Sequence, residues 1–202
     1  MPIGISKKKI LFLTPQLPYP PESGGTLATL QFIDFLSNNY KLNLLCLLKN
    51  QEDKFNENEF LSIYKNKVVD YKSFDLSSKV YSRNALNFLK SILKGVPLSV
   101  LRNSNKDMKA YIKKLLKKDS FDYVIVDHYI TFQYIERFLK LLKRKNIKLF
   151  LRNHNAEHVI WERYAKNQKN IFKRILLKYE CIRIKLYEKH ICMLSDRVLC
   201  VA

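Results

Sequence analysis

Short apolar runs alternate with longer amphipathic stretches along this chain, and the alternation restricts the fold more than any other feature. Runs such as Lys41–Leu48 and Phe121–Val126 are mostly apolar, which is typical of strands covered on both faces. Stretches such as Thr26–Asn38, with an apolar residue every three or four positions, predict the covering helices. We expect strands at 10–14, 41–48, 67–71 (the weakest), 121–126, 147–151 and 196–201, and helices at 26–38, 79–94, 106–118, 130–142 and 157–193, the last with a break near 167–170.

This order predicts the α/β class: one Rossmann-like domain over residues 1–202, with a mostly parallel sheet and helices on both faces. Right-handed crossovers place the carboxyl ends of parallel strands along one edge of such a sheet. Ligands bind at that edge in open α/β sheets, so we look for functional residues directly after each strand.

The net charge of +19 predicts an anionic partner: a nucleic acid, an acidic membrane surface or a phosphorylated substrate. An AT-rich genome is an alternative source of the many lysines. The basic helices at 79–94 and 106–118 are more often solvated faces than membrane contacts. No zinc finger, helix-turn-helix or aromatic-interleaved RNA motif is present in the sequence, so we expect no nucleic-acid partner.

The longest apolar runs, such as Leu44–Leu48, are too short to span a membrane, and the first residues lack the order of a signal peptide. None of the four cysteines forms a CxxC pair and all lie in apolar contexts. We therefore expect a reduced cytoplasmic protein with buried thiols, without metal or disulfide.

A glycine pair, Gly24 and Gly25, precedes the first predicted helix and uses half of the four glycines. Glycines there allow a ligand to approach the backbone, and the free N–H groups favour a phosphate or a negative sugar substituent. The alternative is a plain turn that requires positive φ.

His154 is the candidate catalytic residue, because a neutral imidazole at a strand end can exchange a hydrogen bond with a substrate hydroxyl. Arg152, Asn155 and Glu157 surround it in sequence and are candidate substrate-binding residues. The alternative is a histidine satisfied by backbone groups in a structural loop.

Asp127 and His128 follow another strand and are further substrate-binding candidates, although an aspartate there often caps the next helix. We interpret His158 and His190 as structural and Trp161 as a packing residue.

Four segments together resemble the N-terminal domain of family 4 retaining glycosyltransferases of the GT-B fold, in the branch that assembles polysaccharides. They are Ile10–Thr26 (ILFLTPQLPYPPESGGT), Gly95–Val100 (GVPLSV), Phe121–His128 (FDYVIVDH) and Arg152–Glu157 (RNHNAE). The likeness covers nearly the whole chain.

The resemblance implies two Rossmann-like domains with a cleft between them and no cofactor. Gly24 and Gly25 would face the diphosphate and sugar of a nucleotide-diphosphate sugar, and His154 would lie beside the reacting sugar. The sugar would be transferred with retention to a glycan or lipid-linked acceptor, in the cytoplasm or at the inner membrane face.

The donor-binding domain that the resemblance implies has no counterpart in the 202 residues. We therefore expect a fragment, a split-gene product or a degenerate relative, inactive without a separate C-terminal half. The alternative function is a non-catalytic binding module that holds an anionic partner.

Overall fold

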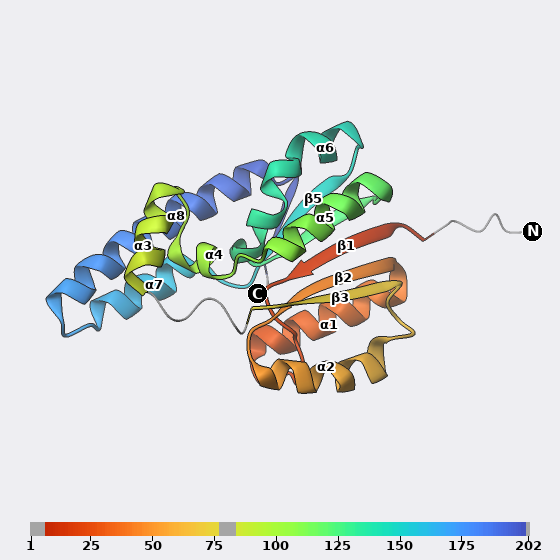
Figure 1. Cartoon of the computed structure of the whole chain (residues 1–202), viewed down its shortest axis with the longest axis horizontal. Coiled ribbons are helices and arrows are strands. Elements are labelled where there is room, and N and C mark those ends of the chain that lie inside the picture. The colour runs from red at the N-terminus through yellow and green to blue at the C-terminus, as the bar shows by residue number, and fades with distance from the viewer. Residues whose placement is uncertain (1–6, 77–83, 201–202) are drawn as a thin grey trace, which may run out of the picture.

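All six predicted strands are present, and they form one parallel sheet of order β3-β2-β1-β4-β5-β6 (Figure 1). The computed structural model describes residues 7–76 and 84–200. The predicted α/β class with a Rossmann-like parallel sheet is confirmed. The strands are β1 Lys9–Thr14, β2 Lys41–Leu48, β3 Asp70–Asp75, β4 Tyr123–Asp127, β5 Lys148–Asn153 and β6 Arg197–Cys200. The α-helices are α1 Gly24–Asn39, α2 Gln51–Tyr64, α3 Asn84–Leu93, α4 Leu98–Arg102, α5 Lys106–Lys118, α6 Leu139–Arg144, α7 Glu157–Lys166 and α8 Ile171–Leu194.

Alternate residues of each central strand belong to two different cores. In β1, Ile10 and Phe12 pack with α1 and α2, whereas Leu11 and Leu13 join the larger core on the other face. Figure 1 shows α1 and α2 on one side of the sheet and α5 and α6 on the other. Burial on both faces explains why these strands are apolar throughout.

Helix α2 was not expected from the sequence. Its residues are mostly polar, and only Phe60 and Tyr64 are buried. The helix is fixed at its start by a capping box, in which the Asn50 side chain accepts from the backbone N–H of Asp53 at 2.7 Å and the Asp53 carboxylate accepts from the backbone N–H of Asn50. Local capping therefore compensates for a weak apolar pattern.

The helix expected at 130–142 is wrong in its first half. Tyr129–Tyr134 and Glu136–Phe138 are 3₁₀-helices, and only Leu139–Arg144 is α-helical. The Thr131 hydroxyl donates to the carbonyl oxygen of Asp127 at 2.6 Å, which ties the first turn to the end of β4.

Several bounds differ by a few residues: β3 begins three residues later than expected and β4 two residues later. Helix α4 was not anticipated, and α3 is described only from residue 84. Residues 79–83 of the expected helix and Val201 of the last strand lie outside the described residues.

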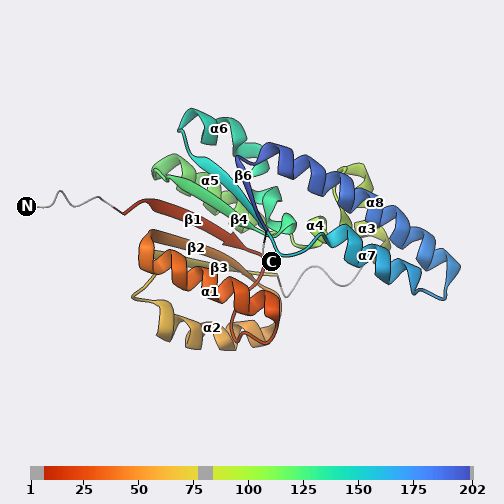
Figure 2. The ribbon, with the colours of Figure 1, turned by 180° about the vertical axis from the view of Figure 1, so that it is seen from behind.

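Helices α7 and α8 form an antiparallel hairpin that extends beyond the carboxyl edge of the sheet, together with α3 (Figures 1 and 2). The break expected near 167–170 separates them. Within residues 7–76 and 84–200, no helix is long and apolar enough to cross a bilayer.

Candidate functional site

A cavity of about 360 Å³ lies at the carboxyl edge of the sheet, where β1, β4, β5 and the start of α1 meet. Six of the eight residues named from the sequence line it: Gly25, Asp127, His128, His154, Asn155 and Glu157. Gly24 and Arg152 do not line it. Polar residues that follow parallel strands are expected to meet at one edge of the sheet, and most of the residues named from the sequence do so. The chemical role of these residues is a proposal.

A buried ion pair lies beneath the cavity. Asp127 and Arg152 are 2% and 4% exposed, and Nη1 of Arg152 donates to Oδ1 of Asp127 at 2.7 Å. The other carboxylate oxygen, Oδ2, accepts from the hydroxyls of Thr14 and Thr29. Asp127 thus binds other side chains and does not cap the next helix.

The pKa of Asp127 lies below its usual value. Burial alone would raise this pKa, but the hydrogen bond from His154 and the charge of Arg152 outweigh burial and favour the ionised carboxylate. The guanidinium of Arg152 also lies over the ring of Phe32, 4.8 Å from its centroid, and donates to the carbonyl oxygen of Ala28 at 3.0 Å. This pair is therefore a fixed charged support under the site.

His154 contacts both members of this ion pair. Its Nε2 lies 3.0 Å from Oδ1 of Asp127, 2.6 Å from Nη1 of Arg152 and 3.3 Å from the hydroxyl of Thr29. Nε2 is thus committed to protein partners in either tautomer. Nδ1 has no partner among the described residues and is not among their buried unpaired atoms, so it is the ring nitrogen available to a ligand.

His128 is strained and incompletely bonded. Its backbone has φ 71° and ψ 144°, a conformation that residues other than glycine rarely adopt. Nε2 lies 3.1 Å from Oε1 of Glu157, whereas the buried Nδ1 has no hydrogen-bond partner among the described residues. Strain of this kind accumulates at functional sites and is worth about 1–3 kcal/mol.

Glu157 is held in place by α8. Both oxygens of Glu188 face the first turn of α7, where Oε1 accepts from the backbone N–H of Glu157 at 2.9 Å and Oε2 lies 2.6 Å from Nδ1 of His158. Ala156, the residue before α7, has no side chain that could cap the helix, so Glu188 provides the acceptor for the N–H groups of its first turn. His158 therefore has the structural role expected from the sequence.

The glycine pair forms the first turn of α1. Ser23 and Thr26 make a capping box that uses the backbone N–H groups of both residues. The N–H groups of Gly24 and Gly25 have no acceptor among the described residues. The alternative of a turn that needs positive φ is wrong, because neither glycine has one.

Nothing in the protein itself requires glycine at these two positions. A Cβ at Gly24 would meet no atom within 4 Å, and one at Gly25 would meet only Oγ of Ser23 at 3.9 Å. Glycine in a helix costs about 0.5–1 kcal/mol relative to alanine. The small residues therefore keep space open above the turn without serving the packing of the chain.

Sequence reasoning missed Lys49, Thr29 and Ser99, which also line the cavity. Lys49 directly follows β2, so the strand-end rule would have named it. Its Nζ donates to Oε1 of Gln16 at 2.8 Å, and burial lowers its pKa. Thr29, on the second turn of α1, and Ser99, in α4, carry no comparable signal.

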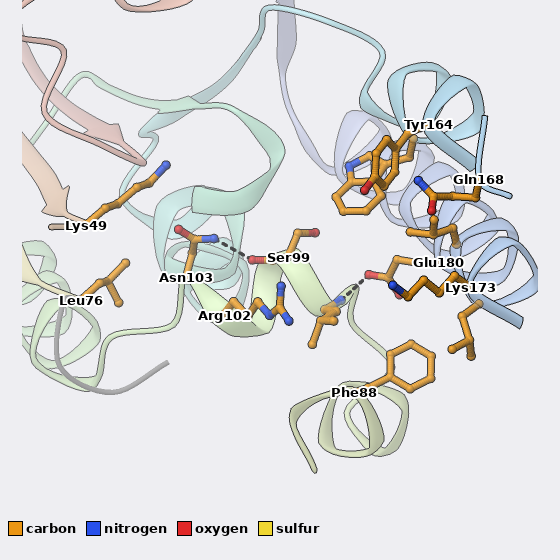
Figure 3. A pocket seen from close by; sticks show the side chains of 14 residues that line it. Lys49, Leu76, Phe88, Ser99, Arg102, Asn103, Tyr164, Gln168, Lys173 and Glu180 are labelled. Atoms are coloured by element: carbon orange, nitrogen blue, oxygen red, sulfur yellow. Dashed lines mark hydrogen bonds between the residues drawn. The ribbon is translucent and has the colours of Figure 1, made fainter. Parts of the chain in front are cut away.

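A second cavity of about 780 Å³ adjoins the first (Figure 3). Lys49, Ser99 and Trp161 line both cavities. Trp161 packs against the larger core, as expected from the sequence, and also borders the cavities. In Figure 3, Tyr164 and Gln168 lie on one side of the cavity and Arg102 on the other. Half of the lining residues are aliphatic or aromatic, and the polar half includes Lys49, Arg102, Lys173 and Glu180.

Neither cavity is lined by a cysteine of the described part of the chain. No three His, Cys, Asp or Glu side chains there are placed to hold a metal ion, and the four cysteines are unpaired. The expectation of buried thiols holds only for Cys46, since Cys200 is exposed and the other two are partly exposed. Cysteines in apolar sequence contexts can lie on the outer face of a helix or at an edge strand.

Comparison with known proteins finds one similar curated protein but does not assign the chain to a protein family. No family model matches the chain. It is similar to a Klebsiella pneumoniae protein described as "Uncharacterized 44.6 kDa protein in cps region", with 27% identity over 201 residues that cover 96% of this chain. The chain spans 45% of the length of that relative.

One solved structure is the Candida albicans trehalose-6-phosphate phosphatase N-terminal domain. It matches 95% of this chain and 39% of that one, with 13% identity and a TM-score of 0.41. This likeness is too distant to bear on function. What is established is an α/β parallel-sheet domain with a relative from a capsule polysaccharide region.

Proposed function

We propose that this chain is the acceptor-side domain of a retaining glycosyltransferase that takes part in polysaccharide assembly. The donor is a nucleotide-diphosphate sugar and the acceptor is a glycan or a lipid-linked glycan. The relative from a cps region supports the polysaccharide context. The transfer activity itself rests on the sequence resemblance and on the chemistry of the cavity.

The observation that carries the proposal is the shared position of Gly25 and His154 on one cavity. Thr29, one turn after Gly25 in α1, lies 3.3 Å from Nε2 of His154, so the start of the helix and the imidazole are neighbours. The N–H groups of Gly24 and Gly25, which have no acceptor within residues 7–76 and 84–200, lie at the positive end of the helix dipole and suit a diphosphate or another anionic group. Nδ1 of His154 suits a sugar hydroxyl beside it.

The ionised Asp127 gives the site a second electrostatic role. Transfer of an activated sugar develops positive charge on the sugar ring and negative charge on the leaving diphosphate. In the proposal, the helix start stabilises the diphosphate while Asp127, through His154, makes the imidazole a better acceptor for a sugar hydroxyl. Asp127 and Arg152 are therefore positioning residues, and His154 is the residue that contacts substrate.

The larger cavity is the proposed place of the acceptor. It adjoins the smaller one through Lys49, Ser99 and Trp161, and aromatic rings such as Trp161 and Tyr164 offer flat faces on which sugar rings stack. An acceptor there would present its hydroxyl towards His154.

The test uses the 202-residue chain alone and mixed with a donor-binding half, for which the remaining part of the Klebsiella relative is a first choice. A panel of nucleotide-diphosphate sugars is titrated calorimetrically, and sugar release and transfer are followed with the mixture. We expect turnover only in the mixture, and a fall of about 100-fold or more with His154→Ala, without loss of folding. Unchanged turnover would remove His154 from the mechanism.

The alternative of a non-catalytic binding module makes a different prediction in the same experiment. A module would bind an anionic ligand through the same cavity but would release no sugar from any donor in any mixture. Because the chain spans less than half of its relative, this outcome must be scored with the second half present.

A further inference from the structure

Helix α8 is apolar on two opposite sides. One side carries Ile184, Tyr187 and Ile191, which are buried in the core. The opposite side carries large apolar residues that are exposed, of which Phe172 is 75% and Leu186 62% exposed. We call this second side the outer stripe, and its members are Ile171, Phe172, Ile175, Tyr179, Ile182 and Leu186.

The spacing of these residues makes the outer stripe continuous. At 100° per residue, all six fall within a sector of about 100° that lies opposite the buried side. Single exposed apolar residues are ordinary on protein surfaces, but a stripe of six along one helix marks an interaction surface.

The exposed charge on α8 is of one sign only. Lys178 and Lys185 are exposed and flank the outer stripe. Both acidic residues of the helix are buried and bonded, Glu180 to Arg183 and Glu188 to His158 and the start of α7. Nothing acidic on α8 therefore offsets its basic flank.

Helix α3 adds a second surface of the same character. The ring of Phe88 contacts that of Tyr179, with centroids 6.3 Å apart, so α3 lies beside the outer stripe. Leu89 and Leu93 are exposed, Lys90 is the basic residue of its last turn, and the helix has no acidic residue. Both helices belong to the part that extends away from the sheet (Figures 1 and 2).

We propose that the outer stripe of α8, with the exposed side of α3, docks on an anionic lipid bilayer. Apolar side chains that enter the acyl boundary and lysines that remain at the headgroups are the features of a helix lying in the interface plane. A second copy of the chain fits less well, because the α8 and α3 surfaces of that copy would bring another basic flank and no exposed acidic side chain of their own. The proposal is independent of sugar transfer.

The charge of α5 alone does not make such a surface. Lys113 and Lys117 are exposed, but the apolar residues of α5 face the core. The basic helix expected at 106–118 therefore has a solvated face, and it supplies a matched control for charge.

The experiment is co-sedimentation of the 202-residue chain with vesicles of phosphatidylcholine alone or mixed with equal phosphatidylglycerol. We expect binding to the mixed vesicles only, weakened at high salt. Ile175→Gln/Ile182→Gln should lower the partition coefficient about tenfold or more. Lys178→Gln/Lys185→Gln should lower it about tenfold, whereas Lys113→Gln/Lys117→Gln should stay within about twofold of the parent.

An apolar control is available in α2, where Phe55 and Ile63 are exposed beside acidic residues. Phe55→Gln/Ile63→Gln should leave vesicle binding unchanged. All substituted positions are exposed, and circular dichroism verifies folding.

Three outcomes overturn the proposal. They are equal binding to neutral vesicles, equal loss with the control pairs, and absence of binding to either vesicle. Dissociation of a solution dimer by Ile175→Gln/Ile182→Gln would instead assign the outer stripe to a second copy of the chain. None of these results depends on whether the cavity binds a nucleotide sugar.

Discussion

The carboxylate of Asp127 lies 3.0 Å from Nε2 of His154, although the two residues are 27 positions apart in sequence. They meet because β4 and β5 pair in parallel, with Asp127 opposite Arg152 in the register. The carboxylate, the guanidinium and the imidazole thus form one hydrogen-bonded unit, of which the first two are buried. Changes in this unit should affect both stability and the orientation of His154.

Asp127→Asn should lower the free energy of unfolding by about 3–5 kcal/mol, because it leaves the buried guanidinium of Arg152 without a counter-charge. Urea unfolding measures the change. The double variant Asp127→Leu/Arg152→Met should cost less than Asp127→Asn, since it removes both charges. A larger loss in the double variant would show that packing, rather than charge, dominates here.

Acid should weaken the fold through the same residue. The pKa of Asp127 is lower in the folded protein than its usual value, so the ionised carboxylate contributes stability above about pH 4. That contribution is lost as the pH falls through the folded-state pKa. Unfolding measured from about pH 2 to 7 should show this decline, and Asp127→Asn should flatten it.

Gly25→Ala should separate stability from ligand binding. A Cβ there meets only Ser23 Oγ, at 3.9 Å, so alanine should raise the free energy of unfolding by about 0.5 kcal/mol. Because Gly25 lines the cavity, the added methyl group should weaken binding of a nucleotide-diphosphate sugar. A stabilised variant with unchanged affinity would argue against ligand contact at this turn.

His128 offers a test of backbone strain. Because the backbone of residue 128 has φ 71°, the His128→Gly variant should have a free energy of unfolding about 1–3 kcal/mol higher than that of His128→Ala. At most positions alanine is the more stabilising of the two residues. Thermal unfolding of His128→Gly and His128→Ala makes the comparison, in which both variants lose the contact with Glu157 equally. Equal stability would mean that the loop relaxes.

Glu188→Ala should cost about 1–3 kcal/mol, since two backbone N–H groups of α7 and Nδ1 of His158 lose their acceptor. Glu162→Ala is the matched control on the hairpin. Its pair with Lys166 is exposed and should contribute far less to stability than the contacts of Glu188. Chemical unfolding of both variants gives the difference, and similar costs would contradict the capping role of Glu188.

Strands β1, β2 and β4 could be predicted because burial on both faces leaves a plain apolar signal. The bounds of β2 and of helix α5 agree with the sequence prediction at both ends. Helix α2 was missed because capping rather than amphipathicity defines it. The 3₁₀ segment after β4 was predicted as α-helix because hydrogen bonds of Thr131 and the unusual φ of His128 leave no trace in the pattern.

The sequence predicted where the candidate site lies, but not how its side chains contact one another. The strand-end rule found His154 and Asp127 but could not show that Asp127 lies beneath the imidazole. Thr29 was missed because a helix interior carries no strand-end signal, although its hydroxyl contacts both residues. Lys49 satisfied the rule and was overlooked.

Helix α8 spans the distance between the core and the solvent. Its last turns hold Tyr187 and Ile191 in the core, and Glu188 in the same turns accepts a hydrogen bond from the start of α7. Its first turns carry Ile171 and Phe172, which are exposed. One continuous helix therefore carries both the exposed apolar residues at the end of the hairpin and the carboxylate that orders the first turn of α7. Glu157 in that turn lines the cavity, so the solvent-exposed end of α8 and the candidate site belong to the same rigid element.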